Sequence, residues 1–513
     1  MASQDSMYKW LWKNEALADA TVYLCVASEY QEDKRCYIAH RVHKAVLATH
    51  SEYFRAKVLR WTCADEPERS PALKCRDESL KLIEDEACSE LDVGGEVSGR
   101  VALFNPQPRA GSHNDCTLAE AFDARGEYEA ALAVLHFMYN GDLPDEMKWP
   151  VNLAQVCLVA ERWAVTSLCS VCLQRLTTYP AALITAPGLL EVLQVLPPSC
   201  DMLPEHAAWS VRVHELTRGL AATEGALPLL LHLYQDVHAV ISEAPLRAQF
   251  RLLPFAAVLL WAGSDELVVD SENSVVELLH WYLLVTGYTR AAQPAMSSLV
   301  RPQHLSPAYA QGRLPSLAWF SVPPATTAQV AIAANCGLGM AGVLPADKAP
   351  AAWSAGPRKQ LAADELRQRT TLKWAIPGQQ LTNLVAKLDI TTVLYSPPMY
   401  SAGSSLRLCL QLGQDTEPDR CTFWCWLQVQ PLATDAGHVL AGPLPLTVMR
   451  FGIARGDCPG PLTDGIIQTN SPKVDLLASS RQGAADLTPF LVNGCLPVVA
   501  CCHLPCKTSQ PAA

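Results

Sequence analysis

Apolar residues follow two different periods near the start of the chain. Two short runs rich in β-branched and aromatic residues, Thr21–Val26 and Cys36–Ala39, are typical of strands. The next stretch, HKAVLATHSEYFRA (His43–Ala56), carries apolar pairs at helical spacing but is interrupted by Thr-His-Ser. Ser51 is a natural N-cap, so the pattern predicts two short helices that meet at a corner. The start of the chain is therefore predicted to be a compact α+β unit.

Helical periodicity returns after a long irregular stretch. Between 61 and 114, charge clusters and Pro/Gly-rich sequence replace the periodic pattern, which predicts an insertion loop. The apolar positions of 127–139 then recur at helical spacing, and Asn140-Gly141 is a typical helix end. The pattern predicts two further helices: Leu153–Arg162, capped by Asn152, and Val165–Leu176.

These blocks together resemble the BTB/POZ family. The resemblance is carried by four segments in the same order, ADATVYL (Ala18–Leu24), HKAVLATHSEYFRA, LHFMYNGDL (Leu135–Leu143) and NLAQVCLVAERWAVTSLCSVCLQRL (Asn152–Leu176). It implies a BTB/POZ domain over 15–178 with 61–114 as an insertion, in which the interrupted helix is a helical hairpin. It also implies matches to the family's recurrent polar positions at Asp19, His43 and Lys44.

The stretch Leu253–Leu284 resembles the BACK helical region that follows BTB domains, which implies a BACK-like region over 179–290. It contains the Ser-acid pairs Ser264-Asp265 and Ser271-Glu272, and each is expected to cap a helix. An amphipathic helix should follow, with one face formed by Val275, Leu278, Leu279 and Tyr282. The acidic residues Asp265, Glu266, Asp270 and Glu272 invite an alternative, paired catalytic carboxylates or calcium ligands, but capping and solvation explain them more simply.

The stretch 291–363 is rich in Ala, Pro and Ser and is interpreted as a linker with a few hydrophobic anchors. Within it, Gly337, Gly339 and Gly342 fit the G-x-G-x-x-G pattern of dinucleotide sites. Such a site needs a helix to begin there, so that its amide end can hold the pyrophosphate. Proline follows almost at once, which disfavours that helix and a nucleotide site with it.

The C-terminal third changes to short runs separated by Gly, Pro and Asp, several of them alternating. The runs are Asp389–Tyr395, Leu406–Leu412, Cys421–Val429, Leu446–Phe451 and Pro497–Leu504. They predict an antiparallel β-sandwich over 364–508. Their order resembles the MATH-like β-domain of plant-type BTB/BACK proteins, the group that includes the light-response BTB proteins. The fold class predicted for the whole chain is therefore α+β and multidomain.

Cysteine is the residue type with the greatest metal-binding potential in this sequence. Cys169 and Cys172 form a C-x-x-C pair inside a predicted helix, without a second pair at zinc-finger spacing. A denser group comprises Cys495, Cys501, Cys502, His503 and Cys506. Neighbouring residues of a strand point to opposite faces, which disfavours one tetrahedral zinc site there. Buried reduced thiols are the preferred interpretation for both groups, with zinc as the alternative, and no cofactor is expected.

The charge and the apolar content of the sequence argue against two classes of partner, nucleic acids and membranes. The 513 residues carry a net charge of −11 and no block of Lys or Arg, which argues against nucleic acid as a partner. The N-terminal sequence lacks the apolar core of a signal peptide, and the most apolar run, Leu252–Ala262, is shorter than the ~20 residues of a membrane span. The expected location is therefore the nucleus, the cytoplasm or both, with no membrane partner.

The resemblance implies a substrate-recognition adaptor of a cullin-RING ubiquitin ligase, a non-catalytic role. The BTB domain would form a homodimer, or a heterodimer with another BTB protein, and hold the cullin scaffold, while the C-terminal domain presents a target protein. The candidate dimer or cullin contacts are Asp19, Val22, Tyr53, Phe54, Met138 and Tyr139, although the aromatic residues fit a plain core as well. The competing classes are a BTB interaction scaffold or transcriptional co-regulator, followed by an enzyme, for which no motif is found.

Overall fold

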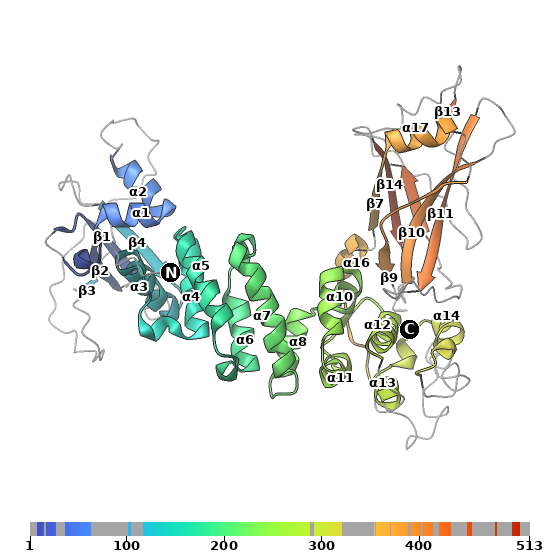
Figure 1. Cartoon of the computed structure of the whole chain (residues 1–513), viewed down its shortest axis with the longest axis horizontal. Helices are drawn as coiled ribbons and strands as arrows, with labels where there is room; N and C mark the ends of the chain where they lie inside the picture. The colour runs from blue at the N-terminus through green and yellow to red at the C-terminus, as the bar shows by residue number, and fades with distance from the viewer. Residues whose placement is uncertain are drawn as a thin grey trace, which may run out of the picture. The chain divides into compact units, whose positions relative to one another are not determined.

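The structure is a computed structural model of the whole chain, and its elements are shown in Figure 1. It describes residues 8–14, 17–26, 36–62, 101–103, 116–287, 292–320, 353, 355–369, 371–387, 391–401, 404–413, 420–431, 449–453, 478–479 and 495–502. The described residues are mixed α+β, mostly helical with small sheets. They divide into two compact units, Met1–Leu220 and Ala221–Ala513, which are called unit 1 and unit 2 below.

Unit 1 is built on a four-stranded sheet with the order β3-β2-β1-β4. Its strands are β1 (Ala20–Val26), β2 (Cys36–Val42), β3 (Val101–Leu103) and β4 (Cys116–Phe122). The first two form the predicted antiparallel pair, and β4 lies parallel to β1 on its other side. The insertion predicted as a loop over 61–114 supplies one strand, because β3 pairs with β2 at the edge of the sheet. The rest of that insertion lies outside the described residues, except for its first two positions at the end of a helix.

The predicted helical corner is confirmed. Helix α1 (Lys44–His50) ends at Ser51, and α2 (Glu52–Thr62) begins directly after it. Ser51 has an extended backbone, with φ −136° and ψ 121°, so the chain turns there. Its hydroxyl oxygen accepts a hydrogen bond from the amide of Phe54 at 3.0 Å, which satisfies one of the free N–H groups at the start of α2. The polar interruption of the sequence is thus an N-cap.

Three helices follow the sheet: α3 (Arg125–Asn140), α4 (Pro150–Arg162) and α5 (Thr166–Thr178). The predicted end of the first is confirmed, because Gly141 has the left-handed backbone (φ 71°) that glycine adopts most easily. The prediction that Asn152 is an N-cap is wrong. Helix α4 already begins at Pro150, and the Asn152 side-chain amide donates instead to the Glu146 carbonyl at 2.9 Å.

Unit 1 continues beyond the predicted BTB boundary at 178. Its further helices are α6 (Ala186–Val195), the short 3-10 helix η6 (Pro198–Met202) and α7 (Pro204–Leu220). Helix α4 contacts α3, α5 and α6, and α7 packs against α5. These contacts place α6 and α7 in the same compact unit as the sheet, so the first part of the predicted BACK-like region belongs to unit 1.

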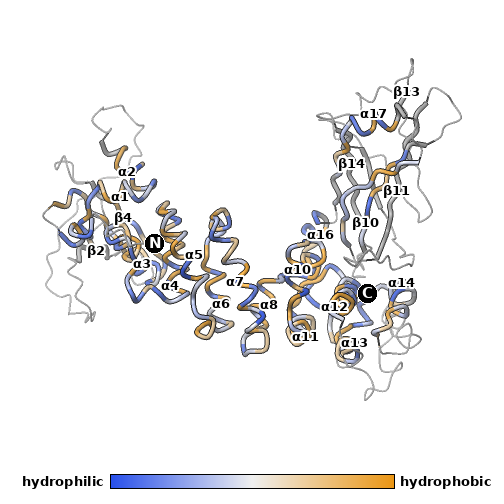
Figure 2. Tube along the Cα trace, viewed as in Figure 1, coloured by the Kyte–Doolittle hydropathy of each residue, from blue (hydrophilic) through white to orange (hydrophobic). Residues whose placement is uncertain are grey.

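The helical part of unit 2 surrounds one buried helix, α12 (Glu272–Thr286). Its other helices are α8 (Ala226–Leu233), α9 (Val237–Ser242), α10 (Ala244–Arg251), α11 (Phe255–Gly263), α13 (Gln293–Ser297) and α14 (Pro307–Gly312). The prediction of an amphipathic α12 is wrong, because every residue of 272–283 is buried. The neighbouring α11 is almost wholly apolar in sequence and is coloured mostly orange in Figure 2. Helix α12 is therefore packed as core, whereas α11 buries Ala257, Val258, Trp261 and Ala262 and leaves Leu260 exposed.

The two predicted serine caps have different outcomes. Ser271 caps α12 as predicted, since its hydroxyl accepts from the Asn273 amide at 3.1 Å. Ser264 does not begin a helix. Its hydroxyl accepts from the Glu266 amide at 3.1 Å within a turn that leads into the short strand β5 (Val268–Val269).

The stretch predicted as a linker, 291–363, is folded in its described parts. Residues 292–320 form α13, α14 and two 3-10 turns, and they bury Tyr309 and Trp319 in the core of unit 2. Trp353 is also buried, and β6 (Lys359–Gln360) pairs in parallel with β5. The glycine motif at 337–342 lies outside the described residues. Composition was misleading here because the few large apolar residues decide the packing.

The C-terminal strands form two antiparallel sheets. One has the order β13-β11-β10-β8, with β9 paired to β10, and the other has the order β12-β14-β7. The strands are β7 (Thr371–Pro377), β8 (Val393–Tyr395), β9 (Met399–Ser401), β10 (Ser404–Gly413), β11 (Arg420–Pro431), β12 (Met449–Ile453), β13 (Ala478–Ser479) and β14 (Cys495–Cys502). Each of the five runs predicted as strands overlaps one of them. Helices α16 (Ala363–Arg369) and α17 (Gly378–Lys387) were not predicted.

Within the described ranges, no helix combines the length and the apolar character needed to cross a bilayer.

Candidate functional site

The residues predicted as dimer or cullin contacts are mostly core residues of unit 1. Val22, Phe54, Met138 and Tyr139 are buried, none more than 1% exposed. Val22 lies on β1, a strand with a neighbour on each side, and Phe54 packs its ring against Trp163 at a centroid distance of 5.2 Å. These four side chains have no surface to offer a partner, so their prediction as direct contacts is wrong. Helical or strand periodicity identifies a packed face but does not say whether it meets the core or another chain.

Tyr139 is held in place by His43, one of the three polar positions singled out in the sequence. The Tyr139 hydroxyl accepts from the His43 amide at 2.8 Å and lies 3.1 Å from its Nδ1. Burial raises the pKa of Tyr139 to about 12, so the phenol stays neutral. Asp19, which is exposed, accepts from the Lys44 amide at 2.8 Å at the start of α1. These contacts tie the start of the helical hairpin to α3 through Tyr139 and to the residue before β1 through Asp19.

Tyr53 belongs to a polar cluster at the surface of unit 1, here called the Tyr53 cluster: Tyr53, Lys57, Glu120 and Arg162. The Tyr53 hydroxyl donates to Glu120, whose other oxygen accepts from Arg162 at 3.1 Å. Burial, followed by the Glu120 carboxylate, raises the pKa of Tyr53. The Lys57 ammonium lies 5.3 Å from the Tyr53 ring centroid, and the Arg162 side chain is 47% exposed. The cluster joins α2, β4 and α4 and contains two cations, the half-buried Lys57 and the partly exposed Arg162.

A cavity of about 520 Å³ opens where α3 begins, beside α4 and the end of α6. Its apolar lining comes mainly from Leu158, Val195, Leu196, Pro197 and Pro198. Its carboxylates are Glu127 and Glu161, and no Lys or Arg lines it among the described residues. A site with this lining can accept an apolar side chain together with a neighbouring positive charge. It is called the α3–α4–α6 cavity below.

Unit 2 has a smaller cavity of about 330 Å³ between α9 and the first residues of β7 and β9. His238 lines it and its Nε2 lies 2.9 Å from the Tyr400 carbonyl oxygen. Arg369 also lines it, but both Asp236, at 2.9 Å, and Glu365 neutralise its guanidinium. These interactions join the helical part of unit 2 to its strands, so the cavity lies at a junction between them, and Glu243 is the carboxylate in its lining.

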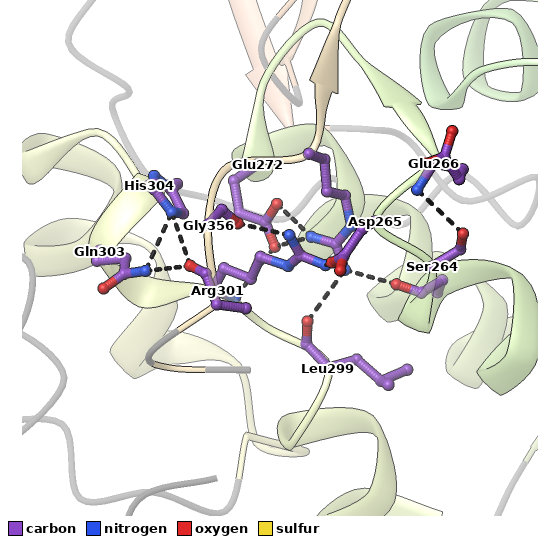
Figure 3. Close-up of polar contacts among 12 residues, drawn as sticks. Ser264, Asp265, Glu266, Glu272, Leu299, Arg301, Gln303, His304 and Gly356 are labelled. Atoms are coloured by element: carbon purple, nitrogen blue, oxygen red, sulfur yellow. Dashed lines mark hydrogen bonds and ion pairs between the residues drawn. The ribbon is translucent and has the colours of Figure 1, made fainter. Parts of the chain in front are cut away.

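Two of the acidic residues near α12, Glu272 and Asp265, form ion pairs with arginines, as Figure 3 shows. Glu272 is buried and pairs with the buried Arg358, and it also accepts from the Arg301 amide at 3.0 Å. The Arg301 guanidinium binds Asp265 and the Gly356 carbonyl. Burial holds the pKa of Glu272 above its ordinary value, and the two arginines oppose that shift. Solvation therefore does not explain Glu272, and its carboxylate faces guanidinium groups instead of a second carboxylate.

A second buried charge cluster lies further along α12. Arg313 binds Glu277 through two nitrogens, at 2.7 and 3.1 Å, and the Tyr309 hydroxyl donates to the same carboxylate at 2.6 Å. His280 lies one turn away, and burial lowers its pKa to about 4. Charge-assisted bonds of this bidentate kind are strong and specific. Both clusters fasten distant segments to α12 and leave no carboxylate pair for acid–base catalysis among these acids.

The cysteine predictions have separate outcomes. Cys169 and Cys172 are buried in α5, and within the described ranges no group of three or more His, Cys, Asp or Glu is placed to hold a metal ion. Cys495, Cys501 and Cys502 lie in β14, whose side chains are not described, and His503 and Cys506 lie outside the described residues.

The chain was compared with protein-family models and with curated proteins. No family model matches the chain, and no curated protein matches it significantly.

Proposed function

We propose that this protein is a substrate-recognition adaptor of a cullin-RING ubiquitin ligase, with unit 1 as the part that dimerises and binds the cullin. The order of elements in unit 1 supports the proposal. An antiparallel strand pair leads into a helical hairpin, and a later strand joins the sheet in parallel before three packed helices follow. Within this arrangement, the helical hairpin after the strand pair is the feature implied by the resemblance of the sequence blocks to BTB domains.

The mechanism would be catalysis by proximity. An adaptor that binds both the cullin and a target raises the effective concentration of the acceptor lysine near charged ubiquitin. The C-terminal sheets, β7–β14, are the proposed target-binding part, since they form a region distinct in secondary structure from the helices before them. No chemistry is then required of the chain itself.

The surfaces available for the cullin are the two described on unit 1. The α3–α4–α6 cavity combines an apolar floor with two carboxylates, which suits a partner segment carrying apolar and basic residues. The Tyr53 cluster offers cations instead. Their opposite charge means that the two surfaces would contact different parts of a partner.

The test is a pull-down of the cullin with the tagged full-length chain. A double variant, Glu127→Lys with Glu161→Lys, reverses the charge of the α3–α4–α6 cavity and should reduce cullin recovery at least tenfold, a loss of about 1.4 kcal/mol. The matched control is Glu146→Lys, an exposed residue of unit 1 that does not line the cavity. The ligase role is refuted if neither the wild type nor the control recovers the cullin, although light scattering shows that the chain is a folded dimer.

The second candidate is a BTB interaction scaffold or co-regulator without a ligase. Two observations favour it. The insertion after α2 occupies the region in which BTB adaptors carry their hydrophobic-x-Glu cullin contact, and four predicted contact residues are buried. A dimer that binds no cullin would support this candidate, whereas a monomer at micromolar concentration would count against both.

A further inference from the structure

Two cysteines from different elements of unit 1 place their sulfur atoms in contact. Cys157 lies in the middle of α4, and Cys200 lies in η6, which follows α6. Their Sγ atoms are 3.3 Å apart. A disulfide bond needs a separation of about 2.0 Å, so a movement of roughly 1 Å would bring the pair to bonding distance.

The two thiols differ in their surroundings. Contact with Cys169 and with Cys200 raises the pKa of Cys157, while the hydrogen bond from Cys157 lowers the pKa of Cys200. Cys200 is thus the better nucleophile and Cys157 the proton donor. Both are free thiols, and Cys157 is fully buried.

Cys200 needs only a local opening to meet a small molecule. It is the one buried residue of η6, and its neighbour Met202 is 88% exposed. The same turn begins at Pro198, which lines the α3–α4–α6 cavity. Cys200 therefore lies in a short 3-10 helix, η6, that is at the surface, and a local movement of η6 would expose its sulfur to solvent.

We propose that Cys157 and Cys200 are a thiol pair that a hydroperoxide oxidises reversibly to an intrachain disulfide. The Cys200 thiolate attacks the terminal oxygen of the hydroperoxide, the O–O bond breaks, and a sulfenic acid forms. The other oxygen takes up the proton that the Cys200 thiol lost and leaves as an alcohol, or as water when the oxidant is hydrogen peroxide. The Cys157 sulfur then attacks the sulfenic sulfur. The S–S bond forms, the S–O bond breaks, and the oxygen leaves as water with the proton of Cys157. Both sulfurs are oxidised by one equivalent of peroxide, and a dithiol reductant reverses the change.

The other cysteines of this region do not provide the same geometry. Cys169 directs its Sγ to the Cys157 carbonyl oxygen at 3.7 Å, as a weak donor to the backbone. Cys172 is buried in the same helix, α5. A metal is not the alternative explanation for the described thiols, because no group of three or more ligands is formed among them. The proposal concerns the chemistry of one pair and is independent of the adaptor role.

Peptide mapping of the full-length chain tests the proposal, because trypsin separates the thiols. Cleavage after Lys and Arg places Cys157 on 149–162, Cys169 and Cys172 together on 163–175, and Cys200 on 176–212. The folded protein is treated with hydrogen peroxide, denatured, alkylated and digested without reduction. We expect the alkylated peptides 149–162 and 176–212 to be lost together and one linked peptide to replace them. Its mass should be that of the two peptides with free thiols minus two hydrogen atoms. Dithiothreitol should restore both.

Serine variants and an internal control for the peroxide dose test whether the disulfide forms between these two thiols. Cys200→Ser and Cys157→Ser should each abolish the linked peptide, while the matched control Cys172→Ser, a buried thiol of the same unit, should leave it unchanged. The exposed Met202 lies on the same tryptic peptide as Cys200 and reports the peroxide dose through its sulfoxide. If Met202 is oxidised in wild type while both thiols are still alkylated, or if either thiol links to another cysteine, the proposal is wrong. The wild-type peptides alone distinguish these outcomes even if a serine variant does not fold.

Discussion

Units 1 and 2 fasten distant segments to their cores with different chemistry. In unit 1 the fully buried ties are uncharged: the Ser51 hydroxyl donates to the Trp163 carbonyl, and Tyr139 bonds to His43. The Glu120–Arg162 ion pair of this unit is partly exposed, since the Arg162 side chain is 47% exposed. In unit 2 the ties are carboxylate–guanidinium pairs, Glu272–Arg358 and Glu277–Arg313, and none of the four side chains is more than 7% exposed. A buried pair adds little net stability, but removing one partner leaves an unpaired buried charge. Unit 2 should therefore be the less tolerant of single changes.

The largest expected effect is that of Arg358→Met. The change leaves Glu272 buried opposite an apolar side chain and should cost about 3–5 kcal/mol of the free energy of unfolding of unit 2. Denaturant unfolding followed by tryptophan fluorescence measures it. The control is Lys359→Met at the next position, which removes an exposed pair with Glu266 and should cost no more than about 1 kcal/mol. Equal losses for the two variants would contradict the comparison.

The second prediction concerns acid. Burial lowers the pKa of His280 to about 4 from the 6.5 of a free histidine, so the unfolded chain binds the proton first as pH falls. The stabilisation from the neutral His280 is fully present above pH 6.5 and is lost as the pH falls to about 4. The free energy of unfolding should fall by roughly 3 kcal/mol over this range. The neighbouring Glu277 opposes this shift, and Arg313 adds to it.

The variant His280→Leu should remove that part of the pH dependence of the free energy of unfolding, because leucine does not titrate. The substitution leaves no polar group unpaired, since the ring nitrogens of His280 have no hydrogen-bond partner among the described residues. Unfolding curves between pH 4 and 7 would show it. His40 in unit 1 has a similarly lowered pKa, about 4, so some slope should persist. The exposed His232→Leu is the matched control. An unchanged acid slope in His280→Leu would mean that unit 2 loses stability through other groups.

Ser51→Ala tests the uncharged ties of unit 1. The hydroxyl both accepts from the Phe54 amide and donates to the Trp163 carbonyl, so its loss should cost about 1–2 kcal/mol. The control is Thr49→Ala, whose hydroxyl donates to the Ala45 carbonyl within its own helix turn, with an expected change within about 0.5 kcal/mol. Thermal unfolding of unit 1 gives the comparison. If both variants behave alike, the corner does not depend on its cap.

The smallest expected effect separates charge from hydrogen bonding at Asp19. Asp19→Ala removes the acceptor for the Lys44 amide and should cost about 0.5–1 kcal/mol. Asp19→Asn keeps a carbonyl oxygen there and should remain within about 0.3 kcal/mol of wild type, because the capping preferences of Asp and Asn are similar. Chemical denaturation of both variants is the measurement. A larger loss for the asparagine variant would show that charge does matter in unit 1.

Local signals in the sequence predicted local structure well. The corner at Ser51 and the helix end at Gly141 depend on capping chemistry within a few residues, and both were predicted correctly. The C-terminal runs were recognisable as strands because their alternation and β-branched residues are also local features. Asn152 shows the limit of such signals, since the proline two residues earlier began the helix first.

The buried ion pairs could not be predicted because their partners are distant in the sequence. Arg358 lies 86 positions after Glu272, in a stretch whose Ala and Pro content indicated a linker. One signal was present: the stretch contains few cations, and its three arginines, Arg301, Arg313 and Arg358, each contact an acidic residue near or on α12. The burial of Met138 and Tyr139 was likewise undecided, because a periodic face fits a core and an interface equally.

The position of β14 in its sheet has a consequence for the synthesis of the chain. It is the central strand, and among the described strands β7 and β12 pair with it alone. Both emerge from the ribosome before β14 and must wait for it with their backbone N–H and C=O groups unpaired. Such long-range pairing is slow and exposes strands to association with other chains. During translation, this nascent sheet should therefore be the part of the protein that depends most on chaperones.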